Sequence, residues 1–329
     1  MRIFSGIQPT GRKHLGNYIG AIVQYVAGQE RGDAIYCVVD LHATTVAFDP
    51  IELRELTYDT AAILLAAGLD PERCILFRQS DVPEQSELAW LLTSVTAYGD
   101  LQRMTQFKDK SAKQRELVTA GLFMYPVLMA ADVLAYRADE VPVGEDQRQH
   151  LELMRDIAIR FNARFGEHMV VPAARIPEVG ARIMDLQDPT SKMSTTAAAS
   201  EEGLVFVLDE PPVIERKFKR AVTDSGSGIH RAPDKPGVSN LIEILAAVRG
   251  VSAEQIEADH AGAGYGDFKA TVASAVIDYL APVRERYNAL RNDQGGLESV
   301  LAAGAERARA IARDTLADAR AAMGVGAPR

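Results

Sequence analysis

Strand-like and helix-like segments alternate through the first half of this chain, and that alternation restricts its fold more than any other feature. "AIYCVV" (Ala34 to Val39) is a continuous apolar run, as expected for a strand buried on both faces of a parallel sheet. "IFSGI" (residues 3–7) and "CILF" (Cys74 to Phe77) are two further strand-like runs. Segments with helical periodicity separate the three. The pattern predicts an α/β domain with a Rossmann-like parallel sheet covered by helices.

The helical segments carry their own start and stop signals. Apolar residues at i, i+3, i+4 and i+7 from Ile19 predict a helix that opens near Gly16. Asp49 and Pro50 are suited to the cap and first position of a second helix, which stops near Gly68. After Lys192 helical patterns dominate, at residues 211–222, 238–248, 253–259, 267–291 and 297–323. The chain is therefore predicted to combine an α/β domain (1–190), a junction (191–196) and an all-helical C-terminal domain (197–329).

Size and charge exclude several classes of protein. With 329 residues the chain is longer than one compact core usually holds. Its two cysteines lie far apart in sequence, which excludes a disulfide framework and a cysteine-rich zinc site, and no protein metal site is predicted. We see no secretion segment and no stretch able to cross a membrane, so we expect a cytoplasmic protein without a membrane partner. The formal net charge of −9 means that any nucleic-acid contact needs a local basic patch.

The stretch "HLGN" (His14 to Asn17) stands at the mouth of the first predicted helix, directly after the first strand. A helix N-terminus at that place attracts phosphate, because its N–H groups are unpaired and its dipole end is positive. His14 and Asn17 can donate hydrogen bonds to phosphate oxygens, and Gly16 allows close approach. The alternative from spacing alone is that Asn17 is only a helix cap and His14 a surface residue. The phosphate-loop pattern G-x-x-x-x-G-K-[ST] is absent.

A second candidate site is the acidic residue in "MYPVLMAADVLAY" (Met124 to Tyr136), a helix predicted to be apolar nearly all round. Asp132 shares one face of it with Tyr125 and Met129. Burying an ionised carboxylate without a partner costs roughly several kcal/mol of folding free energy. Its donor is either a protein group, such as an arginine or a capped segment, or a ligand N–H such as that of indole.

Two short motifs then point to a family. "HLGN" resembles the HIGH signature of the class I aminoacyl-tRNA synthetases, and "DPTSKMSTT" (Asp188 to Thr196) resembles their KMSKS signature. Six more segments, spread over nearly the whole chain, resemble the bacterial tryptophanyl-tRNA synthetases: "FSGIQPTG", "RMTQFKDKS", "VPVGEDQRQH", "VGARIMDL", "AVTDS" and "KPGVSNL".

The resemblance implies an enzyme that activates L-tryptophan with ATP to tryptophanyl-adenylate and transfers it to tRNA(Trp). It implies ATP with Mg²⁺, a homodimer, and an anticodon-binding role for the helical domain. A tyrosine-specific synthetase remains a second possibility. A third is a catalytically altered paralogue that senses tryptophan or adenylate, or regulates through RNA.

The family's functional positions transfer onto matching residues of this chain. The catalytic pair is His14 and Lys192. The ATP site comprises Gln8, Pro9, Thr10, Gly16, Asn17, Gly144, Glu145, Asp146, Ile183, Lys192, Met193, Ser194, Thr195 and Thr196. The tryptophan site comprises Asp132, Tyr125, Met129, Gln147, Phe4, Gly6, His42, Val141 and Val143.

Three of these positions also have plain structural interpretations. Glu145 and Asp146 in a first helical turn match the helix dipole, and a lone histidine such as His42 at a strand end is usually structural.

Thr195 replaces the second lysine of KMSKS, so Lys108, Lys110 or Arg182 is a candidate substitute. "ERKFKR" (Glu215 to Arg220) is either a solvated helix face or an RNA contact.

Overall fold

The fold is described from a computed structural model that covers residues 1–108, 118–144, 147–175, 182–194 and 201–327. Five parallel strands form one sheet in the order β3-β2-β1-β4-β5. They are β1 (Arg2–Ile7), β2 (Asp33–Val38), β3 (Ile75–Arg78), β4 (Glu140–Pro142) and β5 (Ala173–Arg175). The strand order reverses between β1 and β4, which is where open α/β sheets bind ligands. The predicted Rossmann-like sheet is confirmed.

The first crossover begins with α1 (Leu15–Asn17), continues as a π-helical segment (Tyr18–Ile22) and ends as α2 (Val23–Gly28). The apolar periodicity predicted this helix but not its π-helical turn, a feature found often at functional sites. After α3 (Asp40–Ala43) comes α4 (Pro50–Ala67), where Asp49 accepts from the N–H groups of Ile51 and Glu52 as predicted. Gly68 ends α4 with a φ of 118°, which suits glycine.

Further helices connect β3 to β4 and β4 to β5. They are α5 (Pro83–Thr93), α6 (Tyr98–Arg103), α8 (Ala120–Leu134) and α9 (Arg148–Phe165), with α9 in the second of these connections. The side chains of β2 alternate between two cores. Tyr36 and Val38 face the core that also includes α2 and α4, whereas Ile35 and Cys37 face the core that includes α5, α8 and α9. Both faces of the sheet are therefore covered, which explains the continuous apolar run at Ala34 to Val39.

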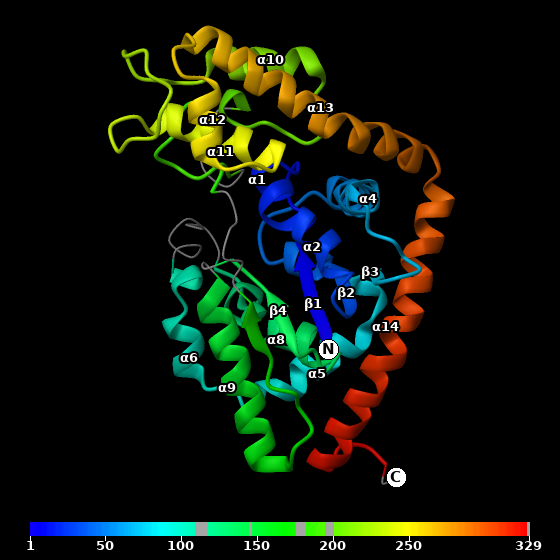
Figure 1. The fold of residues 1–329 in the computed structure, drawn as a ribbon. Helices are drawn as coiled ribbons and strands as arrows, with labels where there is room; N and C mark the ends of the chain where they lie inside the picture. The colour runs from blue at the N-terminus through cyan, green and yellow to red at the C-terminus, as the bar shows by residue number, and fades with distance from the viewer. Residues whose placement is uncertain (109–117, 145–146, 176–181, 195–200, 328–329) are drawn as a thin grey trace.

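The C-terminal part is helical, as predicted. It contains α10 (Pro211–Arg220), α11 (Pro236–Arg249), α12 (Ala253–Asp259), α13 (Tyr265–Asn292) and α14 (Gln294–Met323). Figure 1 shows α10 to α13 gathered beyond the carboxyl end of β1, while α14 runs back along the sheet. Helix α14 packs against β3 and α5, so the last helix of the chain lies on the α/β part.

Candidate active site

The loop after β1 delivers His14 to the mouth of the first crossover helix. His14 Nδ1 accepts a hydrogen bond from the backbone N–H of Asn17 (3.2 Å), and Asn17 Oδ1 accepts one from the backbone N–H of His14 (3.2 Å). This reciprocal pair is a capping box made by a histidine and an asparagine. The cap uses one nitrogen of the ring and the oxygen of the amide. His14 Nε2 and Asn17 Nδ2 remain as donors, so capping and anion binding are compatible.

The electrostatic surroundings keep the His14 ring neutral at physiological pH. His14 is only 4% exposed, and burial, with the charges of Lys13 and then Lys192, lowers its pKa from 6.5 to about 4. Because Nδ1 accepts in the cap, the single proton of the neutral ring sits on Nε2. The effect of Lys192 on this pKa also means that its ammonium group lies within electrostatic range of the ring.

Lys13 is a buried cation that the sequence motifs did not single out. Its ammonium donates to the carbonyl oxygens of Gln8 (2.7 Å) and Thr10 (3.3 Å), and burial lowers its pKa to about 8. The predicted ATP residues Gln8 and Thr10 are exposed, whereas Pro9 between them is buried. Lys13 thus ties the loop that carries all three to the helix mouth. A lysine beside a HIGH-like motif was the available signal in the sequence.

The segment around Lys192 packs beside the same helix mouth. Met193 N–H donates to the carbonyl of Ile183 (3.1 Å), and both side chains are buried. A Cβ added to Gly16 would lie 3.6 Å from Ile183 Cβ and 3.1 Å from the His14 ring. Lys192 itself is exposed and Ser194 is half-buried. Thr195 and Thr196 lie outside the described residues, as does Lys110.

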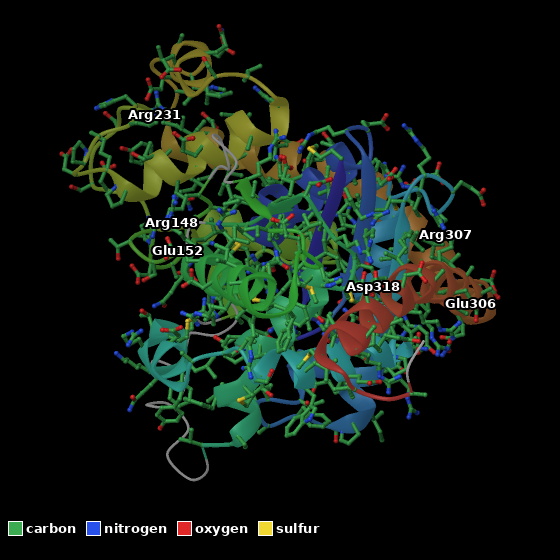
Figure 2. All side chains as sticks on the ribbon, turned by 90° about the horizontal axis from the view of Figure 1, so that it is seen from below. Arg148, Glu152, Arg231, Glu306, Arg307 and Asp318 are labelled. Atoms are coloured by element: carbon green, nitrogen blue, oxygen red, sulfur yellow. The ribbon has the colours of Figure 1, made fainter. Side chains whose placement is uncertain are left out.

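The turn before α9 holds the remaining predicted ATP positions. Gly144 is exposed, and its carbonyl accepts from the N–H of Gln147 (2.9 Å), which is the N-cap residue of α9. Gln147 is half-buried and stands at the carboxyl end of β4, next to β1 in the sheet. Glu145 and Asp146 lie outside the described residues, so their positions stay predictions. Figure 2 labels Arg148 and Glu152, which open the same helix.

Asp132 lies in α8 and is 2% exposed, as predicted from the apolar helix pattern. Its protein partners are neither an arginine nor a capped segment. His42 Nε2 lies 2.7 Å from Oδ2, and the side-chain amides of Gln79 and Gln85 donate to Oδ1 at 2.7 and 2.8 Å. The histidine predicted for the pocket wall is therefore also a structural partner of the carboxylate. The sequence analysis missed Gln79 and Gln85, although Gln79 follows β3 at the edge where parallel strands place site residues.

Apolar and aromatic side chains surround this carboxylate. Tyr125 donates to or accepts from His150 Nε2 (2.7 Å), and its ring meets the His42 ring edge-on at 6.3 Å. Phe4 is buried and stacks on Tyr136 at 5.4 Å. The other predicted wall residues lie in β1, in or directly after β4, and in α8. Gly6 is exposed, Val141 is buried, and Val143 and Met129 are half-buried against the same core.

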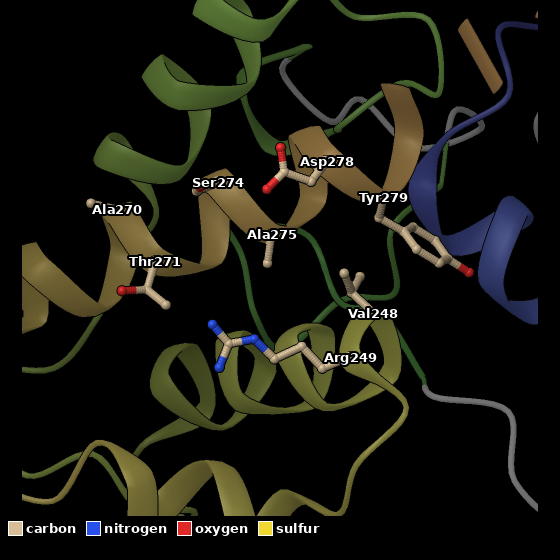
Figure 3. Close-up of a pocket in the computed structure, with 8 residues that line it drawn as sticks. All are labelled: Val248, Arg249, Ala270, Thr271, Ser274, Ala275, Asp278 and Tyr279. Atoms are coloured by element: carbon tan, nitrogen blue, oxygen red, sulfur yellow. The ribbon is translucent and has the colours of Figure 1, made fainter. Parts of the chain in front are cut away.

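A separate groove of about 700 Å³ lies in the helical part, between the end of α11 and α13. Figure 3 shows that Arg249 reaches toward the side of α13 that carries Thr271 and Ser274. None of the predicted site residues lines it. One of its residues, Tyr279, meets Tyr18 of the first crossover helix edge-on at 5.6 Å, so the groove borders that helix.

Comparison with known proteins agrees with this architecture. Residues 1–281 match the family described as tRNA synthetases class I (W and Y). The tryptophan--tRNA ligase 2 of Streptomyces avermitilis is 53% identical over 321 residues, which cover 97% of this chain and 95% of that protein. The crystal structure of tryptophanyl-tRNA synthetase from Mycoplasma pneumoniae has a TM-score of 0.90 at 37% identity, covering 99% and 98% of the two chains. The Campylobacter jejuni enzyme, complexed with ADP and tryptophan, has a TM-score of 0.86 at 33% identity, covering 99% and 100%.

Proposed function

Since this chain belongs to the class I tRNA synthetases of the tryptophan and tyrosine group, we propose that it is a tryptophan--tRNA ligase. It activates L-tryptophan with ATP to tryptophanyl-adenylate and transfers the amino acid to tRNA(Trp). The observation that carries this proposal is the 53% identity to a tryptophan--tRNA ligase over 97% of the chain, which includes both signature regions. The Campylobacter jejuni relative, solved with ADP and tryptophan, supports sites for tryptophan and for an adenine nucleotide.

In the first step the tryptophan carboxylate attacks the α-phosphorus of ATP, and pyrophosphate leaves. The carboxylate is ionised at neutral pH, so the step needs no general base. Catalysis then depends on in-line alignment and on donors directed at the phosphate oxygens. We assign the donors to His14 Nε2–H and Asn17 Nδ2 on one side and to Lys192 on the other. In the second step a ribose hydroxyl of the tRNA's terminal adenosine takes the aminoacyl group, and AMP leaves.

Mg²⁺ enters this proposal with ATP. In the parts of the chain that the structure describes, three or more His, Cys, Asp or Glu side chains do not gather into a group that could hold a metal ion. We therefore propose that phosphate oxygens and water supply most of the ligands, as is common for Mg²⁺ bound with a nucleotide. The ion would neutralise phosphate charge while the chain's own donors orient the triphosphate.

We place the tryptophan side chain against Asp132, between Phe4 and Gly6 of β1 and the residues of β4 and α8 named above. The indole ring needs apolar walls, and its N–H is a donor without an acceptor function, which suits an acceptor-only carboxylate. Gln147 at the start of α9 is proposed to face the amino acid's ammonium group. A pocket that pairs a ligand N–H discriminates strongly against analogues that lack it.

The helical region is proposed to read the tRNA anticodon, although the run Glu215 to Arg220 offers less free charge than its sequence indicates. Lys217 is buried and paired with Asp209 at 2.7 Å, so it does not face solvent. Arg216 and Arg220 both pair with Glu202, at 3.2 and 3.4 Å. Lys219 is exposed. Any RNA contact from α10 therefore rests on Lys219 and on two arginines that already share an acidic neighbour.

We propose a homodimer built on the face of α5 and α6. Trp90, the single tryptophan of the chain, is 74% exposed on α5, and Tyr98 is 69% exposed on α6. Tyr98 lies 5.4 Å from the ring of Phe123, which in turn lies 5.2 Å from Phe107. Exposed aromatic side chains such as Trp90 and Tyr98 are typical of protein interfaces.

A cytoplasmic location is part of the same proposal, and its support is the pair of free, buried cysteines. Within the described residues, we find no helix with the length and apolar character that crossing a membrane requires.

The experiment that tests the function is ATP–pyrophosphate exchange with each of the twenty amino acids, followed by aminoacylation of total tRNA. We expect exchange to depend on tryptophan and charging to be confined to tRNA(Trp). Exchange with tyrosine alone would overturn the assigned substrate. Exchange without charging would overturn the ligase activity and support a sensor of tryptophan or adenylate.

A further inference from the structure

Four polar side chains form a closed set in the interior around Asp132. Gln79 and Gln85 are fully buried, and Asp132 and His42 are 2% and 5% exposed. All three neighbours bring a nitrogen within 2.8 Å of the carboxylate. Because buried charge is costly unless it is hydrogen-bonded, these contacts explain how α8 tolerates an aspartate in its apolar core.

These hydrogen bonds use most of the acceptor sites of the Asp132 carboxylate. An ionised carboxylate has about four lone-pair sites, two on each oxygen. The two glutamine amides occupy both sites of Oδ1, and His42 occupies one site of Oδ2. Among the described residues, one acceptor site therefore remains, and it is on Oδ2. A ligand whose apolar part carries one N–H group has one donor for this one remaining acceptor site on Oδ2.

The scaffold fixes the orientation of at least one of these amides. Gln79 stands at the end of β3, and its Oε1 accepts from the backbone N–H of Leu41 (3.1 Å), next to His42 in α3. With its oxygen anchored there, the amide nitrogen must face Asp132. The donors of His42 and Gln79 thus come from the carboxyl ends of two adjacent strands, β2 and β3.

The side-chain amide of Gln85 makes a hydrogen bond through its nitrogen but not through its oxygen. It lies in the first turn of α5, and its Nε2 donates to Asp132 while its Oε1 is buried without a hydrogen-bond partner in the described structure. A buried acceptor without a hydrogen bond lowers the stability of the folded protein. A leucine would avoid that cost, so the amide is unfavourable for packing and is explained by its contact with Asp132.

We propose that Gln79 and Gln85 are positioning residues that hold the Asp132 carboxylate in one orientation, with its single vacant acceptor site turned to the indole N–H of tryptophan. The inference rests on the proposed function and deepens it. Neutral amides stabilise the carboxylate without cancelling its charge, whereas a bidentate arginine would occupy both oxygens. The two glutamines therefore set selectivity for the N–H, although they act only through Asp132.

The test compares tryptophan with its analogue 3-benzothienylalanine, in which sulfur replaces the indole N–H. ATP–pyrophosphate exchange gives kcat/KM for both substrates in the wild type, in Gln85→Met and in Gln79→Met. Methionine keeps the length of the side chain and removes the amide donor. We expect the preference for tryptophan to fall by about tenfold or more in each variant, mainly through a higher KM for tryptophan, consistent with the loss of one directed hydrogen bond.

Tyr136→Phe is the matched control. Tyr136 is fully buried within electrostatic range of the same carboxylate, and its Oη has no hydrogen-bond partner in the described residues. Removing that oxygen alters the same interior without removing a donor to Asp132, so the preference should stay as in the wild type. The ratio of the two substrates within one variant is independent of the fraction of folded enzyme, so a partly unstable variant still gives a result.

The outcomes separate the inference from the proposed function. A wild type that activates neither substrate overturns both. A wild type that prefers tryptophan, with variants that lose activity on both substrates in equal proportion, leaves the ligase assignment intact and assigns the glutamines a merely structural role. A wild type that does not distinguish the two substrates overturns the contact between Asp132 and the indole N–H.

Discussion

At the scale of residues, one side chain can form the hydrogen bonds that stabilise the fold and still have a donor or acceptor left for a ligand. His14 and Asn17 cap a helix with one atom each and retain a donor each. The two interpretations open from the sequence, helix cap and phosphate contact, are therefore compatible. Among the described residues, Asp132 likewise has three protein donors and retains one acceptor site.

The protonation of His14 predicts a pH dependence. Its pKa is about 4 in the folded protein against 6.5 for an unperturbed histidine, because burial and two nearby cations disfavour the charged ring. Between those values the unfolded chain binds more protons, so this residue makes stability fall as pH drops from 6.5 to 4. Urea unfolding at pH 4.5, 5.5 and 7 should show that the wild type loses stability relative to His14→Asn toward acid.

Asparagine is a suitable control at that position because it keeps an N-cap acceptor without titrating in this range. In pyrophosphate exchange, the same neutral ring predicts no acid limb near pH 6.5 that depends on His14. A limb at that pH that vanishes in His14→Asn would contradict the assigned protonation state.

Lys192 is expected to act on the rate of activation. Lys192→Ala should lower kcat for pyrophosphate exchange by about 10²–10³-fold, the usual loss for one donor to a transition-state oxyanion. The KM for tryptophan should change only a few-fold, because Asp132 and the apolar walls are untouched. Lys219→Ala, which removes an exposed lysine of α10, serves as the control. A variant with only a raised KM for tryptophan would refute this role.

At the scale of elements, α14 illustrates how close backbone contact depends on glycine. A Cβ added at Gly304 would lie 1.8 Å from the carbonyl oxygen of Leu76 in β3. Arg307 strengthens the same contact, since its Nη1 donates to the carbonyls of Pro71 (2.8 Å) and Cys74 (3.0 Å). Figure 2 labels Arg307 and Asp318 along this helix. The helix thereby covers β3, an edge strand that would otherwise be exposed to pairing.

Gly304→Ala should therefore destabilise the protein by about 2 kcal/mol or more, because the helix must move away from the strand. Gly295→Ala in the first turn of α14 is the control, since the nearest atom to its added Cβ is Asp293 Oδ1 at 3.9 Å. That change should stabilise by up to about 1 kcal/mol, from helix propensity alone. Equal urea midpoints for the two variants would show that α14 does not pack on β3 as described.

At the scale of the whole molecule, the helical part and the α/β part share contacts at both ends. Tyr279 of α13 meets Tyr18 beside the helix mouth, and α14 returns to β3 and α5. Ion pairs also join them: Arg291 Nε lies 2.7 Å from Asp59, and Glu298 lies 2.9 Å from Arg78. The boundary predicted at residues 191–196 therefore separates a stretch of alternating strands and helices from a stretch of helices only. Helix α14 belongs to the second stretch in sequence, but it packs on the α/β part.

The proposed dimer predicts a change of mass in solution. Light scattering of the wild type should give twice the chain mass of 35.7 kDa. Trp90→Glu should shift the mass toward the monomer, because a charge at an aromatic interface cannot be buried unpaired. Val251→Glu replaces an exposed apolar residue of the helical part and should leave the mass unchanged. A monomeric wild type, or a dimeric Trp90→Glu, would place the interface elsewhere or remove it.

The parallel sheet, the capped helices and the burial of Asp132 were predictable because each depends on local periodicity or on a neighbour three or four residues away. The donors to Asp132 were not, because Gln79 and Gln85 lie 53 and 47 residues before it. Lys217 shows the same limit: it was grouped with a surface charge run, but the fold buries it against Asp209. A side chain's environment depends on which elements pack on it, and composition does not specify that.

By itself, the amino-acid sequence predicted the first three strands, the helices of the C-terminal part, and the chemical groups available at the helix mouth and in the apolar helix. Only the tertiary structure decided that His42 and two glutamines leave Asp132 one acceptor site, and that α14 leaves the helical region to cover β3. The physical reason is that hydrogen-bond direction and close packing depend on the relative placement of segments distant in the chain. Local sequence specifies how each segment folds, and the packing of segments specifies which groups meet.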